Sequence, residues 1–204
     1  MMTQTDHIKD NQAFVFELDD VLYPAKDYWL QVYYLFAQFI EYGEQIPADG
    51  IIRFMQETYL TDGMEGIFEK TAAQFNLPEK YKVNFDLLQQ NARLPLKLLL
   101  FAPVLNFMQQ VKSAGKPIFL VAEGNPAEDL NKIRQIEWNG LEQYLKVYFA
   151  AEMEHGYAGA LANIVMENGL DSGKILVVGK NRELNNLAFF NTYRYLSIGK
   201  LSLT

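Results

Sequence analysis

The 204-residue sequence contains no cysteine, which excludes disulfide bonds and thiolate metal ligands. It also has no run of about 18 uncharged apolar residues, the length that a membrane-spanning helix needs, and its polar start does not resemble a signal segment. Basic residues are in the minority, 18 against 25 acidic ones, and the net charge is −7. These absences predict a cytoplasmic protein that binds neither nucleic acid nor a membrane.

Half of the residues are hydrophobic, and they fall into a regular order of short apolar segments and helical patterns. The apolar segments have the character of buried strands and cover residues 13–16, 117–122, 146–150, 174–179 and 193–198. Helical patterns lie at 103–114, 126–139, 158–168 and 183–189. This alternation predicts an α/β fold in which helices cover both faces of a parallel sheet. Ligand sites in such sheets lie at the carboxyl ends of the strands.

The first predicted strand is separated from the second by about 100 residues, far more than a crossover connection needs. Residues 26–92 read as helical throughout, with breaks at Gly43, Pro47, Gly63 and Pro78. The first inserted helix has only a narrow polar stripe, so we expect most of its circumference to be buried by packing. A dimer surface or an aromatic ligand box would explain the same pattern, so a homodimer is an open alternative.

Residues 14–24, FVFELDDVLYP, resemble the first motif of the haloacid dehalogenase (HAD) superfamily. In that motif a strand ends in Asp-x-Asp-x-Thr, often followed by Leu-Tyr. The element order, with a helical insertion after the first strand, is similar to that family as well. The resemblance implies a three-layer, Rossmann-like core of residues 1–24 and 93–204, with a mostly parallel sheet. It also implies an inserted all-helical cap of residues 25–92.

The family's chemistry is phosphoryl transfer or dehalogenation through an aspartate nucleophile. The resemblance places the nucleophile position at Glu17 and the general acid and base at Asp19. Most of the other motif positions hold residues of a different type from the family's. This chain has Val21 where the family has Thr, and Ala122 where the family has Ser or Thr. His155 lies near the position of the family's Lys, and Lys180 and Asn185 occupy the positions of its metal-binding carboxylates.

Each replacement has a chemical consequence. The extra methylene of Glu17 moves its carboxylate by about 1 Å, which can cost on the order of 100-fold in rate. Ala122 has no hydroxyl for a phosphate, and His155 is a cation only when protonated. The Lys180 ammonium repels Mg²⁺ where the family uses hard carboxylate oxygens. We therefore expect no cofactor, and Mg²⁺ only if the chain is an active hydrolase.

Several polar residues have two readings. Glu123, Gly124 and Asn125 form a candidate substrate-binding loop, because backbone N–H groups at the start of a helix bind anions. Alternatively, the Asn125-Pro126 pair serves only to start the helix. Asp19 and Asp20 are either site residues or solvated caps of the turn after the first strand. Lys180 is expected to pair with Glu17 or Asp19, with direct phosphate binding as the alternative.

Two functions follow from these features. In the first, a HAD-like protein has lost Mg²⁺-dependent hydrolysis, or keeps it only very weakly, and acts as a binding or interaction module for a small phosphorylated molecule or a protein partner. In the second, the chain is an active phosphohydrolase of a small phosphomonoester, such as a nucleotide or sugar phosphate, with Glu17 as nucleophile. Fold resemblance supports the second function, but fold alone does not establish activity.

Overall fold

The computed structural model describes residues 4–180 and 192–201, and strand β1 (Ala13–Glu17) lies at the centre of its sheet. On one side β1 pairs in parallel with β3 (Ile118–Ala122), and on the other with β6 (Ile175–Gly179). Strands β5 (Leu145–Phe149) and β7 (Arg194–Ser197) complete the parallel order β5-β3-β1-β6-β7. The predicted strands and their parallel arrangement are confirmed.

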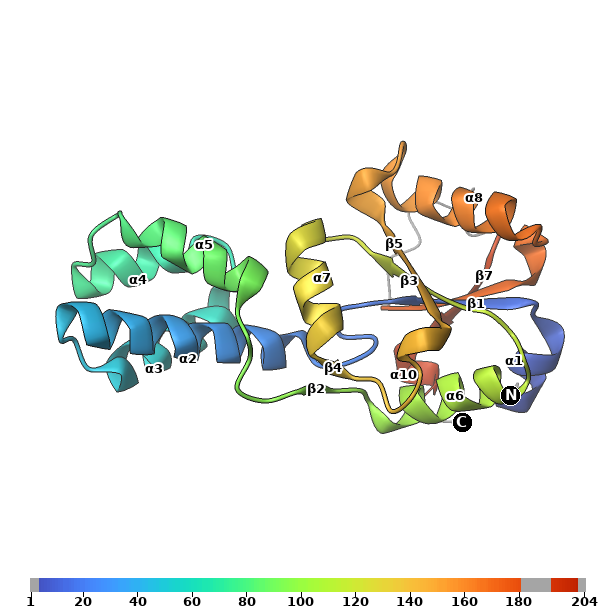
Figure 1. The fold of residues 1–204 in the computed structure, drawn as a ribbon, viewed down its shortest axis with the longest axis horizontal. Coiled ribbons are helices and arrows are strands. Elements are labelled where there is room, and N and C mark those ends of the chain that lie inside the picture. Colours follow the sequence, from blue (N-terminus) through green and yellow to red (C-terminus); the bar gives the residue numbers. More distant parts are fainter. Residues whose placement is uncertain (1–3, 181–191, 202–204) are drawn as a thin grey trace.

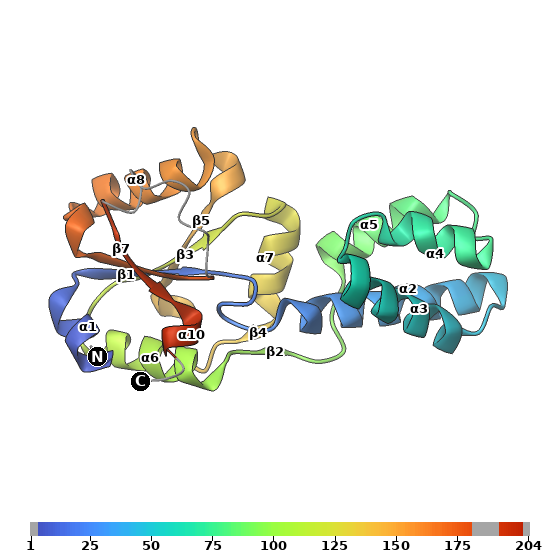
Figure 2. The same cartoon turned by 180° about the vertical axis from the view of Figure 1, so that it is seen from behind.

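Helices cover both faces of this sheet. Alternate residues of β1 point to opposite faces, as the period of a strand requires. Phe14 and Phe16 meet Phe107 of helix α6 (Ala102–Ser113), with ring centroids 5.5 and 6.2 Å apart. Val15 instead belongs to the apolar cluster that contains helix α8 (Gly156–Asn168). Figures 1 and 2 show α6 and α8 on opposite sides of the sheet, which confirms the three-layer α/β prediction.

Four helices follow β1 before the chain returns to the sheet, and we call them the cap. They are α2 (Ala25–Glu44), α3 (Ala48–Asp62), α4 (Ile67–Phe75) and α5 (Tyr81–Asn91). The cap extends away from the sheet as a separate lobe (Figure 1). Its interior is aromatic, with ring centroids of Phe36, Phe68 and Phe85 between 5.0 and 5.9 Å apart. The proposed limits of the cap, residues 25 and 92, stay a prediction.

Helix α2 is less buried than its sequence suggests. Tyr28, Trp29 and Phe36 are buried as expected, but Phe39 is 39% and Tyr34 is 44% exposed. The reason is that α3 and α5 pack against α2 without enclosing it, so its far side stays open. The expectation that packing buries most of the circumference holds for the side that faces α3 and α5 and fails at Phe39, and the dimer alternative stays a prediction.

Several short elements were not predicted. The helix expected at 126–139 is shorter, because α7 (Pro126–Gln135) gives way to strand β4 (Ile136–Glu137), which pairs with β2 (Leu98–Leu99). The remaining elements are α1 (Gln4–Asp10), α10 (Ile198–Leu201) and the 3₁₀ turns η1 (Glu142–Tyr144), η2 (Ala150–Glu152) and η3 (Ser172–Lys174). The helix predicted at 183–189 lies outside the described residues. Within the described ranges, no helix is long and apolar enough to cross a membrane.

Candidate functional site

The carboxyl ends of β1, β3 and β6 meet at one edge of the sheet. In the strand register Glu17 lies opposite Val121, and Phe16 lies opposite Val178. The edge therefore brings together Glu17, the loop of residues 123–125 and Lys180, which are far apart in the sequence. This is the edge at which parallel sheets place their ligands.

A cavity of about 340 Å³ opens at this edge. Its polar lining consists of the carboxylates of Glu17, Asp19, Glu123 and Asp129, together with Gly124 and Lys180. Four acidic residues thus face one lysine in the described part of the wall. Among the described residues of this lining the acidic side chains outnumber the basic ones, which opposes the entry of an anion.

Glu17, the predicted nucleophile position, is 7% exposed at the end of β1. The hydroxyl of Tyr157 donates to its Oε1 at 3.2 Å, and the backbone N–H of Lys180 donates to its Oε2 at 3.2 Å. The carboxylate lies directly against Gly179, where an added Cβ would be only 2.5 Å from Oε1. Tyr157 was not predicted, since no motif marks a tyrosine that is 140 residues away from Glu17.

Asp19, the predicted acid–base position, has both carboxylate oxygens engaged. Its Oδ1 accepts a hydrogen bond from the Tyr23 hydroxyl at 2.7 Å. Its Oδ2 accepts one from the Lys132 ammonium at 2.6 Å. Burial, followed by the charge of Asp19, raises the pKa of Tyr23 far above its ordinary value, so this tyrosine remains a donor. Asp19 is therefore a fixed acceptor in this arrangement.

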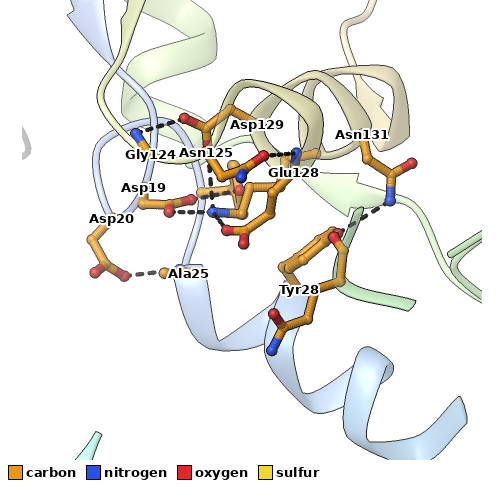
Figure 3. A network of polar contacts seen from close by, with 12 residues as sticks. Asp19, Asp20, Ala25, Tyr28, Gly124, Asn125, Glu128, Asp129 and Asn131 are labelled. Atoms are coloured by element: carbon orange, nitrogen blue, oxygen red, sulfur yellow. Dashed lines mark hydrogen bonds and ion pairs between the residues drawn. The ribbon is translucent and has the colours of Figure 1, made fainter. Parts of the chain in front are cut away.

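Lys132 is the central cation of the site, and the sequence did not reveal it. Its side chain is 2% exposed, and its ammonium lies 2.6 Å from Asp19 Oδ2, 2.7 Å from Glu128 Oε1 and 3.3 Å from Asp129 Oδ1. Figure 3 shows Asp19, Glu128 and Asp129 gathered around this point. A lysine within a helix is normally interpreted as a solvated residue, so only the three-dimensional neighbours identify this one.

Three carboxylates share this ammonium, and the pKa shifts reflect both the burial and the excess of negative charge. Burial opposes the charge on Lys132, but the neighbouring Asp19 and Glu128 outweigh it and raise the lysine's pKa. Burial also raises the pKa of Glu128 and of Asp129, and Lys132 counteracts both increases. The ammonium therefore stays charged, and it counteracts the effect of burial on the pKa of Glu128 and of Asp129.

In the candidate substrate-binding loop, one backbone donor and the Asn125 side chain are engaged within the protein. The backbone N–H of Gly124 donates to Asp129 Oδ2 at 2.8 Å. The side chain of Asn125 accepts from the backbone N–H groups of Ala127 and Glu128 at 3.0 and 3.3 Å, so Asn125 is the N-cap of α7. Glu123 lines the cavity. The helix-start interpretation of this loop is thus confirmed, while a substrate-binding role stays a prediction.

The structure does not bring every candidate position into the site. His155 stands just before α8 with its side chain 79% exposed, and its nearest acidic partner is Glu154 at 3.8 Å, as expected of a surface residue. Ala122 is buried at the end of β3 and offers only a methyl group. Asn185 lies outside the described residues.

The expected partner of Lys180 was wrong. Its ammonium pairs with Asp20 rather than with Glu17 or Asp19, and both side chains of this pair are substantially exposed, at 54% and 39%. The reason is that Lys180 already meets Glu17 through its backbone N–H, which directs the side chain outward. Asp20 also accepts from the backbone N–H of Ala25 at 2.8 Å, which confirms a capping role at the start of α2.

The donor set does not suit Mg²⁺. Within residues 4–180 and 192–201, no group of three or more His, Asp or Glu side chains is arranged to hold a metal ion. Where the HAD resemblance places a metal carboxylate, Lys180 contributes an ammonium group, which repels a hard cation. The residues described here therefore do not fit the family's metal.

Comparisons with known proteins show the fold. No family model matches the sequence, and no curated protein matches it. Among solved structures, an L-2-haloacid dehalogenase covers 91% of this chain and 82% of its own, with 14% identity and a TM-score of 0.55. A hydrolase from Streptococcus pneumoniae TIGR4 covers 95% and 97%, with 16% identity and a TM-score of 0.53.

A HAD family hydrolase from Deinococcus radiodurans R1, with bound phosphate and sodium, is also similar. It covers 92% of this chain and 80% of its own, with 12% identity and a TM-score of 0.51. The chain therefore has the fold of the HAD hydrolases: a Rossmann-like core that carries a helical cap. At these identities the similarity shows fold, and the chemistry has to be argued from the site.

Proposed function

We propose that this chain is a HAD-fold protein that has lost Mg²⁺-dependent hydrolysis and acts as a binding or interaction module. The observation that carries this proposal is the state of Asp19. Both oxygens of this acid–base position are occupied, by Tyr23 and by the buried Lys132. A carboxylate held between two donors is a poor proton shuttle.

The surroundings of Glu17 support the same conclusion. A phosphoryl-transfer site needs cations and free N–H donors around the anion it attacks. Here the described lining holds four carboxylates and one ammonium, and the N–H of Gly124 is engaged by Asp129. The same argument applies to 2-haloacids, because they also carry a negative charge.

The charge of the cavity bears on the partner as well. Of the two expected partner classes, a small phosphorylated molecule is disfavoured by the acidic lining, and a protein partner is favoured. We propose no nucleic-acid or membrane partner, consistent with the net charge of −7, and no resident metal, because Lys180 stands where the family has a metal carboxylate. A homodimer and a cytoplasmic location stay predictions from the sequence.

One observation favours the alternative of an active phosphohydrolase. Glu17 borders the cavity and accepts a hydrogen bond from Tyr157, so its carboxylate is positioned by the protein and can in principle attack a substrate. In that alternative Glu17 is the nucleophile, Asp19 the acid and base, and Mg²⁺ the cofactor.

A turnover assay separates the two proposals. Purified protein is incubated with a broad panel of phosphomonoesters and with 2-haloacids, each with and without Mg²⁺. We expect no turnover above that of Glu17→Ala. Glu154→Ala, at an exposed side chain, is the matched control for contaminating phosphatase. Turnover of about one per second in the parent and in Glu154→Ala, lost in Glu17→Ala, would establish the alternative.

A further inference from the structure

One face of α7 is both polar and buried. Glu128, Asn131, Lys132 and Gln135 follow the spacing i, i+3, i+4, i+7 and therefore share a side of the helix. Asn131 is 8% and Lys132 2% exposed, whereas Leu130 is 36% exposed. This reverses the usual amphipathic pattern. Buried polar groups need hydrogen-bond partners, and those of Asn131 and Gln135 include groups at the two ends of the cap.

The partners of Asn131 lie at both chain connections of the cap. The Asn131 Nδ2 donates to the Tyr28 hydroxyl at 3.1 Å and to the Ala92 carbonyl at 3.0 Å. Tyr28 lies in the first turn of α2, where the chain enters the cap, and Ala92 follows α5, where the chain leaves it. Figure 3 shows Asn131 directed at Tyr28. A single amide group thus joins the core to both connections.

Two further residues of the same face strengthen these connections. The Gln135 Nε2 donates to the same Ala92 carbonyl at 3.2 Å. The Lys132 ammonium lies 5.4 and 5.1 Å from the ring centroids of Tyr28 and Trp29, within the range of a cation–π attraction. The Tyr28 hydroxyl also donates to the Gln89 carbonyl of α5, which ties the entry of the cap to its exit.

We propose that α7 is a latch that holds the cap in one orientation on the core. The cap is joined to the core by only two chain connections, and a rotation of the cap has to move at least one of them. The bonds from Asn131, Lys132 and Gln135 restrain both. The cavity at the sheet edge is therefore not opened and closed by movement of the cap. This inference does not depend on whether the protein hydrolyses a substrate.

The absence of cysteine permits a direct distance measurement. Tyr42→Cys in α2 and Met166→Cys in α8 introduce spin labels at positions that are 91% and 74% exposed, one on the cap and one on the core. Pulsed electron resonance on the full chain then reports the distance between the two. We expect a single narrow distribution, which inorganic phosphate and Mg²⁺ leave unchanged.

The test variant is Asn131→Asp, which keeps the side chain's size but removes both donated bonds. We expect it to broaden the distribution towards other cap orientations. Gln110→Ala, which loses a side-chain bond to Gln4 elsewhere on the core, should leave the distribution narrow. If Asn131→Asp does not fold, Gln135→Ala is judged by the same criterion. A broad or two-population distance distribution in the parent would contradict the proposed latch. A distribution in the test variant that is as narrow as in the parent would contradict it as well.

Discussion

Replacing Lys132 by Met tests the role of the buried ammonium most directly. Met keeps an unbranched apolar stem but removes the charge that the three carboxylates share and that lies over the rings of Tyr28 and Trp29. Removing one partner from a buried ion pair costs about 3–5 kcal/mol, because the remaining charge is left uncompensated. The side chain of Asp129 is only 2% exposed, so the loss of its ion pair with Lys132 should cost an amount in this range.

The other two carboxylates reduce the expected cost. The side chain of Asp19 is 36% exposed and that of Glu128 is 16% exposed, so water screens part of their interaction with the ammonium. We therefore expect Lys132→Met to lower the free energy of unfolding by about 3 kcal/mol near pH 7.5. Lys180→Met is the control. Its exposed pair with Asp20 should contribute no more than about 1 kcal/mol.

The pH dependence provides a second, independent readout. Burial raises the pKa of Glu128 and Asp129, and Lys132 opposes the increase. In Lys132→Met both pKa values should therefore be higher still. A carboxyl whose folded pKa is raised destabilises the fold when ionised, so stability is recovered as pH falls through that pKa. The stabilisation linked to the raised pKa of Lys132 is fully present below the unfolded pKa of a lysine and is lost only as pH rises into the alkaline range, so it does not change between about pH 7.5 and about pH 5.

The stability difference between the parent and Lys132→Met should thus shrink as pH falls from about 7.5 to about 5. Urea unfolding followed by far-ultraviolet circular dichroism at both pH values measures it without relying on Trp29 fluorescence, which the substitution perturbs directly. A loss no larger than that of Lys180→Met, or one that is the same at both pH values, would refute the reasoning.

Two further predictions concern Glu17 and the glycine beneath it. Glu17→Asp alone should create no phosphatase activity, because catalytic groups that act as a unit are strongly non-additive; a large gain in the same phosphomonoester assay would show that the remaining site is competent. Gly179→Ala should lower unfolding stability by about 1–3 kcal/mol, since its Cβ would lie 2.5 Å from Glu17 Oε1. Gly50→Ala is the control, because its Cβ would have its nearest neighbour at 3.5 Å, and urea unfolding should show it to be neutral or stabilising. Equal stability of the two variants would contradict the close contact between Gly179 and Glu17.

The fold was predictable because its signals are local. Each core strand is a short apolar run, and residues such as Phe14, Val15 and Phe16 are buried on both faces of the sheet, as a parallel sheet requires. Strand β4 was missed because Ile136 and Trp138 extend the helical pattern of α7 by chance. Their alternation of buried, exposed and buried residues is a strand signal too short to compete with it.

The site was predictable only in part, because its decisive contacts are distant in sequence. Glu17 and Asp19 stand out as acidic residues after a buried strand. The lysine that neutralises Asp19 is 113 residues away, and the tyrosine that contacts Glu17 is 140 residues away. A local clue was the set of polar residues at 128, 131, 132 and 135, whose spacing places them on one face of a helix.

The structure also relates the charge of the site to the position of the cap. The sequence predicted that Lys180 pairs with Glu17 or Asp19; in the structure the ammonium on Asp19 belongs to Lys132. Because Lys132 lies on α7, the helix that neutralises Asp19 also holds Tyr28 and Trp29 of the cap. Restoring the family's residues at 17, 122 and 180 would leave Lys132 on Asp19 and Asp129 on the Gly124 N–H. The loss of hydrolysis that we propose is therefore rooted in α7 as much as in the motif positions, and regaining it would require loosening the same contacts that fix the cap.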